Sequence, residues 1–525
     1  MKRNFILACI FASLSISSYA QGEMDAFNLS YNDLKGTARS VGMGGAFGAL
    51  GGDISGIAIN PAGIGSYKSS EIVTTLNLSN ANAKTSINGN TTKDSKFKAN
   101  FDNLGFVGVF PIDSDVAPYI NFGFTYNRLK SFDRKISMNG YEASSSLADY
   151  IANRVNGYKE GQGIPESSLY TNASPFTKDS EHWLGALGYQ GYLIDPIVKG
   201  GNKYRSSISQ LGNPSLDNHL HIREKGYIDS YDFNVGTTFS DIFSLGVTVS
   251  VTDIRYTLYS SYTEEWYSGS DYQGGYDFNN YLRTEGSGWQ VKAGFILKPV
   301  KELRIGAAYH SPTWYNLTDY YSASIGSDLF GNDVYIDSFE EVGATTYSDY
   351  KFRTPDKWVF SLAGIIGKYA VISADYELTN YKNMHLKDDY GTPFSNENTY
   401  IKRDFKNSST VRIGAEIRAT PQLSFRAGYM WQQSPVKKSL VNGSKDGSYT
   451  AATAGTVTHY SLVGDANYIT YGLGYEFSPS LYADIAFVMK SRKDDLYSYG
   501  GSDRIELKNN TFSGLLTIGY RFGAK

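Results

Sequence analysis

The sequence has little cysteine, little proline and no long apolar run beyond its first twenty residues. Its only cysteine among 525 residues, Cys9, lies in a segment that we expect to be removed, so disulfides and thiolate metal sites are excluded from the mature chain. Fourteen prolines argue against a disordered, proline-rich chain. No later run of 18 apolar residues predicts a membrane-spanning helix, but strands of a membrane barrel alternate in polarity and would give no such run.

An excess of one charge is also missing. The formal net charge is -3 and no long basic run is present, so we expect no nucleic-acid partner. Histidines number only six. His219 and His221 have the spacing of two side chains on one side of a strand, which suits a metal or haem iron, but no third ligand lies nearby. A solvated loop explains them as well, so we expect no cofactor and keep haem as an alternative ligand.

The N-terminus has the pattern of a secretory signal. Lys2 and Arg3 precede an apolar run from Phe5 to Ile16, and Ser18-Tyr19-Ala20 supplies the small residues of a cleavage site. We therefore expect residues 1–20 to be a signal peptide.

Segments in which apolar and polar residues alternate follow one another beyond residue 70. The chain is also rich in glycine, with 54 residues, and in tyrosine, with 43. Between residues 369 and 379, for example, Ile372 and Tyr376 share one face while Asp375 and Glu377 share the other. Period-two alternation of this kind indicates strands with one apolar and one polar face.

Fourteen such strands are predicted. They start near Glu71, Phe101, Tyr119, Gly226, Phe243, Gly288, Glu302, Lys357, Lys368, Ser408, Pro421, Asn467, Ser480 and Thr511. Every second connection is short, as in "SDIF" at 240–243, and we expect the others to be long loops. This alternation is typical of outer-membrane barrels. The prediction is an all-β fold, a 14-stranded antiparallel transmembrane β-barrel over residues 71–525. We expect this barrel to lie in the bacterial outer membrane, in contact with its lipids. Its largest extracellular loop is expected to span about 131–225.

A glycine-rich stretch, "GTARSVGMGGAFGALGGDISGIAINPAGIGSY" at 36–67, precedes the first strand. The lumen of a fourteen-stranded barrel is too wide for its own side chains to fill, so we expect residues 21–70 to form a luminal hatch. Its glycines would permit positive φ angles and close passage along the wall, namely Gly42, Gly44, Gly45, Gly48, Gly51 and Gly52. A phosphate-binding loop is disfavoured because no Gly-Lys-Ser/Thr follows.

This stretch and the strand "EIVTTLNLS" after it resemble the N-terminal hatch of the FadL/TodX family of outer-membrane transporters for hydrophobic compounds. The triplet Asn60-Pro61-Ala62 matches that family's hatch motif. The resemblance implies passive, non-enzymatic uptake of long-chain fatty acids or other lipophilic molecules through a luminal pocket and a lateral opening. It also implies that the triplet lies near that opening, although a plain Asn-Pro turn would explain it too.

The long segment at 131–225 contains an apolar cluster: Trp183, Leu184, Leu187, Tyr189, Tyr192, Leu193 and Ile194. The first five are candidates for capturing a ligand, and the same cluster would serve as the small core of a folded loop. A protein partner at the extracellular loops, with the barrel as a scaffold, is the alternative to transport.

Two further alternatives remain open at this point. His459-Tyr460-Ser461 has the histidine and serine spacing of a barrel phospholipase, but no orienting group or oxyanion site can be located. A hydrophilic porin would need an open lumen, which a hatch would close. Nothing in the sequence identifies the cargo.

Overall fold

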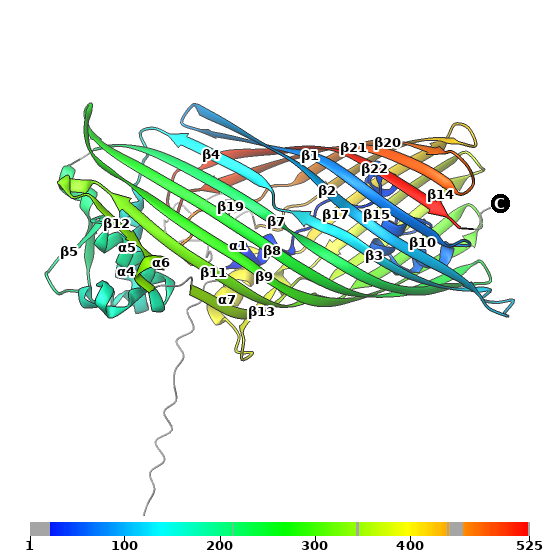
Figure 1. Cartoon of the computed structure of the whole chain (residues 1–525), viewed down its shortest axis with the longest axis horizontal. Helices are drawn as coiled ribbons and strands as arrows, with labels where there is room; N and C mark the ends of the chain where they lie inside the picture. The colour runs from blue at the N-terminus through cyan, green and yellow to red at the C-terminus, as the bar shows by residue number, and fades with distance from the viewer. Residues whose placement is uncertain (1–21, 213, 343–345, 438–439, 441–454, 523–525) are drawn as a thin grey trace, which may run out of the picture.

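Fourteen long strands form the wall of the molecule (Figure 1). The computed structural model describes residues 22–525 except 213, 343–345, 438–439, 441–454 and 523–525, so the expected signal peptide lies outside the described residues. The wall strands are β1 (Glu71–Ile87), β2 (Asn90–Pro111), β3 (Tyr119–Ser131), β7 (Ser215–Phe239), β8 (Phe243–Ser268), β9 (Asp271–Val300), β10 (Leu303–His310), β14 (Lys357–Ile366), β15 (Ala370–Thr379), β17 (Ser408–Arg418), β18 (Leu423–Gln432), β20 (Ala466–Glu476), β21 (Leu481–Tyr497) and β22 (Ile505–Arg521).

Each wall strand pairs antiparallel with the next, and the last pairs with the first. The closing ladder joins β1 to β22 from Glu71 with Arg521 to Ser86 with Glu506. Lipid tails offer no hydrogen-bond partners, so a spanning sheet is stable only when closure removes its edges. The predicted 14-stranded antiparallel barrel is confirmed.

The two faces of the strands differ as the alternation predicts. On β15, Ile372 is 51% exposed while Asp375 is 2% exposed, because the first points outward and the second into the lumen. The same pattern of exposed apolar side chains runs around the outer surface and forms the lipid-facing belt of the barrel.

One expectation about the connections is wrong. β1 and β2 continue as one hairpin to a turn at Asn88-Gly89, and β8 and β9 continue to a turn at Gly269-Ser270, so neither pair is joined by a long loop. Asn88 and Gly89 both have positive φ, as a tight two-residue hairpin turn requires. In "TTKDSKFKAN" at 91–100 both faces carry polar residues and Phe97 is the one large apolar side chain, so the alternation that marks membrane strands is lost there.

Shorter elements lie beyond the wall strands, at the end of the barrel where Figure 1 places α4 and α5. The strands are β4 (Arg134–Gly140), β5 (Ile194–Pro196), β6 (Tyr204–Ser206), β11 (Trp314–Ser327), β12 (Val334–Asp337), β13 (Thr346–Arg353), β16 (His385–Asp388) and β19 (Tyr460–Leu462). The helices are α4 (Leu147–Gly161), α5 (Ser180–Gln190), α6 (Ser338–Val342) and α7 (Ser395–Asp404), with 3-10 turns η2 (Glu166–Ser168), η3 (Thr171–Ala173), η4 (Pro175–Thr177), η5 (Ser207–Leu211), η6 (Leu329–Gly331) and η7 (Tyr381–Asn383). In the part of the chain that the structure describes, no helix is both long and apolar enough to cross a membrane.

Residues 22–67 lie inside the barrel and form what we call the hatch. Their elements are α1 (Glu23–Ser30), α2 (Ala38–Gly42), α3 (Ile54–Ile59) and η1 (Pro61–Ser66). The ring of Phe27 on α1 stacks on Phe405 at 5.5 Å and lies 5.6 Å from Tyr381, both beyond the membrane strands. α2 and the turn after it pack against β18, β20 and β21. The hatch therefore touches both the wall strands and the elements beyond them.

Glycines in the wall allow this close approach. A Cβ atom on Gly428 of β18 would lie 2.2 Å from the backbone nitrogen of Gly44 in the hatch, closer than such atoms can come. Gly44 itself has a φ of +65°, which few other residues adopt.

We expect Gly428→Val to displace the hatch while the barrel still closes, because the added methyl groups meet hatch backbone rather than a neighbouring strand. Planar-bilayer recordings should then show a larger and noisier conductance than the unchanged protein. Gly364→Val on β14 is the matched control, since no heavy atom lies within 4 Å of the added Cβ. Equal conductance in both variants would contradict a hatch held by this contact.

Candidate functional site

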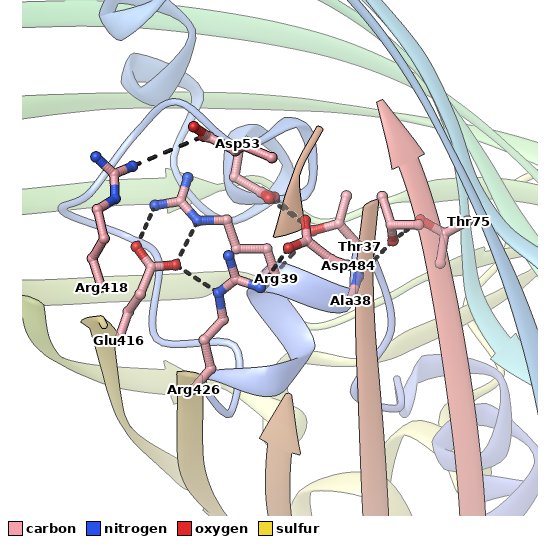
Figure 2. A network of polar contacts seen from close by, with 12 residues as sticks. Thr37, Ala38, Arg39, Asp53, Thr75, Glu416, Arg418, Arg426 and Asp484 are labelled. Atoms are coloured by element: carbon pink, nitrogen blue, oxygen red, sulfur yellow. Dashed lines mark hydrogen bonds and ion pairs between the residues drawn. The ribbon is translucent and has the colours of Figure 1, made fainter. Parts of the chain in front are cut away.

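A buried network of ion pairs holds the hatch to the wall (Figure 2). The guanidinium of Arg39 donates two hydrogen bonds of 2.9 Å to Glu416 on β17. Arg426 of β18 donates to the same carboxylate at 2.6 Å and to Asp484 of β21 at 2.5 Å. Buried charges need such partners, and removing one leaves the others uncompensated at a cost of about 3–5 kcal/mol. One hatch arginine thus joins a chain of charges contributed by three wall strands, β17, β18 and β21.

Hydrogen bonds within the hatch make it a structured unit. The hydroxyl of Thr37 donates to Asp53, at 2.8 Å for the nearer oxygen, and Asp53 accepts from the backbone nitrogens of Ser55 and Gly56 at the start of α3. The backbone nitrogen of Ala38 donates to the hydroxyl of Thr517 on β22 at 2.7 Å. The hatch is thus also tied to the strand that closes the barrel.

The triplet Asn60-Pro61-Ala62 lies against β8 and β9. The side-chain amide of Asn60 donates to the carbonyl of Gly48 at 2.7 Å and to that of Phe295 on β9 at 3.0 Å, and its oxygen accepts from the nitrogen of Ala62. A Cβ on Gly246 of β8 would lie 2.2 Å from the carbonyl oxygen of Pro61. The triplet is therefore both a turn within the hatch and a contact with the wall, and its role at a lateral opening stays a prediction.

Four of the six hatch glycines singled out in the sequence have positive φ angles, namely Gly44, Gly45, Gly51 and Gly52. Gly48 is needed for a different reason, since its nitrogen donates to Asp375 and an added Cβ would collide with Ser361.

An internal cavity of about 180 Å³, the upper cavity, lies between the start of the hatch and the half of the wall that adjoins the shorter elements. Its apolar lining comes from Phe27, Phe132, Leu258, Val457 and Val463, and its charged lining includes Lys130, Lys490, Arg492 and Asp33. The cavity therefore offers an apolar part and a cationic part, as an amphiphilic molecule requires.

Three cations surround the ring of Tyr31 at the charged part of this cavity. Lys130, Lys490 and Arg492 lie 5.6, 5.6 and 5.4 Å from its centre. Lys490 forms an ion pair with Asp33 at 2.5 Å, and Arg492 forms one with Asp494 at 2.8 Å. Lys130 makes no ion pair in the described part of the chain, and its ammonium instead donates to the carbonyl and the side-chain oxygen of Asn28. Lys130 is therefore the member of this cluster that has no carboxylate within ion-pairing distance.

Asp33 borders four internal cavities, whose volumes are about 180, 160, 100 and 80 Å³. Its backbone nitrogen donates to the carbonyl of Leu129 on β3 at 3.2 Å. Burial alone would raise the pKa of this carboxyl, but Lys490 and, less strongly, Lys130 and Lys35 lower it to about 2. Asp33 thus lies where the upper cavity and the smaller cavities beside the hatch come close to one another.

His459 and Ser461 also border the upper cavity. Burial lowers the pKa of His459 to about 4, so its imidazole is neutral at physiological pH. His219 and His221 lie elsewhere, on β7, where they contact Asn139 and Ser137 of β4. Across the described residues, no three His, Cys, Asp or Glu side chains are grouped to hold a metal ion.

The candidate capture residues of the long segment occupy different environments. Trp183, Leu184 and Leu187 on α5 are buried in the core that α5 shares with α4, and Trp183 is 1% exposed. Tyr189 donates its hydroxyl to Glu166 at 2.6 Å, and Tyr192 is exposed. Burial favours the small-core interpretation for the first three, while ligand capture stays a prediction.

Sequence reasoning missed the charged lining of the upper cavity. Lys130, Lys490 and Asp33 are far apart in the chain, and only the closed barrel brings them together. Lys490 and Arg492 have the same parity on β21, which could have indicated a cationic face inside the lumen.

Comparison with known proteins agrees with this architecture. The family described as outer membrane protein transport protein (OMPP1/FadL/TodX) matches residues 240–498. The chain belongs to this family. Members of the OMPP1/FadL/TodX family reside in the bacterial outer membrane, and so does this protein. No curated protein sequence matches the chain.

Solved structures share the fold at low sequence identity. A FadL homologue of Pseudomonas aeruginosa is 14% identical, with 94% of this chain and 100% of that chain covered and a TM-score of 0.52. The toluene transporter TodX of Pseudomonas putida is 13% identical with coverage of 94% and 100% and a TM-score of 0.49. A deltaS2 mutant of the monoaromatic hydrocarbon channel TodX is 12% identical with coverage of 93% and 100% and a TM-score of 0.50.

The ion pair of Asp33 and Lys490 predicts an acid-sensitive hatch. The pKa of Asp33 is about 2 in the folded protein against 3.8 in a free side chain, so the pair contributes about 2 kcal/mol above pH 4 that is lost as the pH falls toward 2. Hydrogen exchange should show weaker protection of residues 28–36 in Asp33→Asn at pH 7, and less change on acidification than in the unchanged protein.

Asp241→Asn is the control for this experiment, because the pair of Asp241 with Lys68 is largely exposed. Full protection of residues 28–36 in Asp33→Asn would show that the pair does not hold the segment.

Proposed function

We propose that the protein carries hydrophobic small molecules passively across the outer membrane, with the upper cavity as their binding site. The observation that carries this proposal is a partly apolar cavity inside a barrel that the hatch closes from below. Burying apolar surface stabilises a bound solute by about 0.8 kcal/mol per methylene group, which a water-filled pore would not offer. A hydrophilic porin would need an open lumen, and the buried network around Arg39 argues against one.

The cargo class that fits this cavity best is a long-chain carboxylate. Phe27, Phe132 and Leu258 would contact the chain. Lys130, which has no ion-pair partner among the described residues, would receive the carboxylate through a charge-assisted hydrogen bond. A neutral aromatic hydrocarbon would offer this lysine no negatively charged partner.

A route out through the wall is supported where β2 and β3 separate. Their ladder ends at the pair of Asn103 with Asn127, whose side chains share a hydrogen bond of 2.7 Å. Further out, Lys98 of β2 next meets Asp133 at 3.4 Å. Between these two contacts β3 has a register irregularity at Leu129 against β7. We propose this unpaired stretch as the site of a lateral opening.

The side chain of Arg128 lies in the unpaired stretch between β2 and β3. Its guanidinium donates to Asp229 of β7 at 2.6 Å and to Asn100 of β2 at 3.2 Å, and it lies 4.8 Å from the centre of the Tyr227 ring. Arg128 also borders the 160 Å³ cavity beside the hatch. The side chain thus lies between an internal cavity and the outer face, and we propose that it narrows the exit.

Uptake measurements test the proposed transport. Cells lacking the protein should accumulate a labelled long-chain fatty acid more slowly than cells that produce it. Lys130→Met should weaken binding of the fatty acid to the purified protein about tenfold, and binding of its methyl ester much less, because only the acid carries the charge. Lys301→Met, an exposed lysine at a short turn and outside the cavity lining, is the control for loss of a lysine. Equal uptake with and without the protein would favour a scaffold for a protein partner instead.

Replacing the pair that fills the stretch between β2 and β3 should widen it. We expect Arg128→Ala combined with Asp229→Asn to speed release of bound cargo into vesicle lipid, measured by stopped-flow fluorescence of a labelled fatty acid. The combination Arg521→Ala with Glu476→Gln removes an ion pair of 3.3 Å at the short-turn end and is the control. Unchanged release in the first variant would argue against an exit at this place.

A further inference from the structure

The lipid-facing belt ends at a clear boundary on the strands that lead to the extracellular part. Tyr231, Val251, Trp289 and Trp314 pair in one row across β7, β8, β9 and β11. All four side chains are exposed, and the two tryptophan rings lie 4.5 Å apart. Aromatic side chains of this kind mark the interface of lipid tails and headgroups. This row therefore sets the level of the outer-leaflet headgroups.

Basic side chains follow on the outer face beyond this row. They are Arg223 and Lys225 on β7, Arg255 on β8 and Arg283 on β9. Each lies four to eight residues beyond the row on its own strand, which at about 3.3 Å per residue and about 45° of tilt is roughly 9 to 19 Å toward the outside. Phosphorylated sugar headgroups of outer-leaflet glycolipids occupy this depth.

The charges in this patch are not balanced. Arg255 and Arg283 share one carboxylate, Glu285, at 3.6 and 3.5 Å. Asp253 and Asp229 are the other acids in the adjoining rows, and Asp229 is already paired with Arg128 at 2.6 Å, so the four cations exceed the two remaining acids by two. Arg283 also lies 4.4 Å from the centre of the Tyr320 ring, which orients its guanidinium along the surface. An anion such as a phosphate ester would complete this arrangement.

A groove of about 450 Å³ adjoins the basic side chains on the outer face and spans β4, β7, β8, β9 and β11. Tyr259 and Tyr281 form part of its lining, with ring centres 5.0 Å apart, and Tyr259 is 47% exposed. Arg223 and Lys135 are paired in register beside them. The remaining lining supplies hydroxyl, amide and carboxylate groups that suit sugar hydroxyls: Ser261, Asn279, Ser322, Asp94 and Asp337.

We propose that this surface binds a phosphorylated glycolipid of the outer leaflet. Its acyl chains would lie along the belt beside Trp289, its phosphates would contact Arg255 and Arg283, and its sugar rings would pack on Tyr259 and Tyr281. A soluble anion would contact only the basic side chains. Along the surface, the apolar boundary, the basic side chains and the groove lie in the same order as the acyl chains, phosphates and sugar rings of a glycolipid. The site lies outside the barrel and is independent of the proposed luminal route.

Native mass spectrometry of the full protein in detergent tests this proposal, with a purified lipid A-core glycolipid and its dephosphorylated form as probes. We expect the phosphorylated glycolipid to bind Arg223→Ala/Arg255→Ala/Arg283→Ala roughly tenfold more weakly than the unchanged protein. The dephosphorylated form should bind the unchanged protein weakly. Migration on unheated gels verifies that the variant barrel is closed.

The control variant removes three cations at the opposite end, Lys298→Ala/Lys301→Ala/Arg418→Ala, and should bind the glycolipid as the unchanged protein does. Binding to the patch variant at full strength would overturn the proposal, as would an equal loss in the control variant or equal binding of the dephosphorylated form. Fatty-acid uptake should be the same in the patch variant and the unchanged protein, which separates this site from transport.

Discussion

Closure of the sheet is the constraint on which the rest of this molecule depends. A strand edge in hydrocarbon would leave backbone groups without partners, so β1 must meet β22, and fourteen strands then enclose a space wider than their own side chains can fill. The hatch fills the lower part of that space. Its contacts with the wall, such as Gly44 against Gly428 and Arg39 with Glu416, follow from the need to pack a folded segment inside a closed cylinder.

Charged groups inside the lumen have two roles, and whether a group has an ion-pair partner distinguishes them. Glu416, Arg426 and Asp484 satisfy one another and the hatch, so their charges are balanced and structural. Around Tyr31 the balance is incomplete, because Lys130 makes no ion pair among the described residues and donates instead to two oxygens of Asn28. A bound carboxylate would be favoured near Tyr31 but not in the network around Glu416. Charge balance therefore distinguishes a binding region from a framework within the same lumen.

The wall could be predicted from the sequence and much of the site could not. Alternation at Ile372 and Asp375 reports directly on lipid and lumen, so the number of strands and their faces follow from the local pattern. The hairpin extensions at 91–100 are polar on both faces, and their pairing depends on neighbouring strands. Lys130, Asp33 and Lys490 meet only after closure. The apolar content of Trp183 and Leu187 is the same for a core and for a capture site, and only burial separates the two.

The ladder between β1 and β22 also has a consequence for assembly. It joins segments more than 400 residues apart, so the cylinder cannot be complete until the last strand has been made, and long-range pairing of this kind is slow. The hatch lies inside and contacts β22 through Thr517, so it must be enclosed before or during the final pairing step. Insertion into the outer membrane therefore has to keep the first and last strands apart until the N-terminal segment is in place.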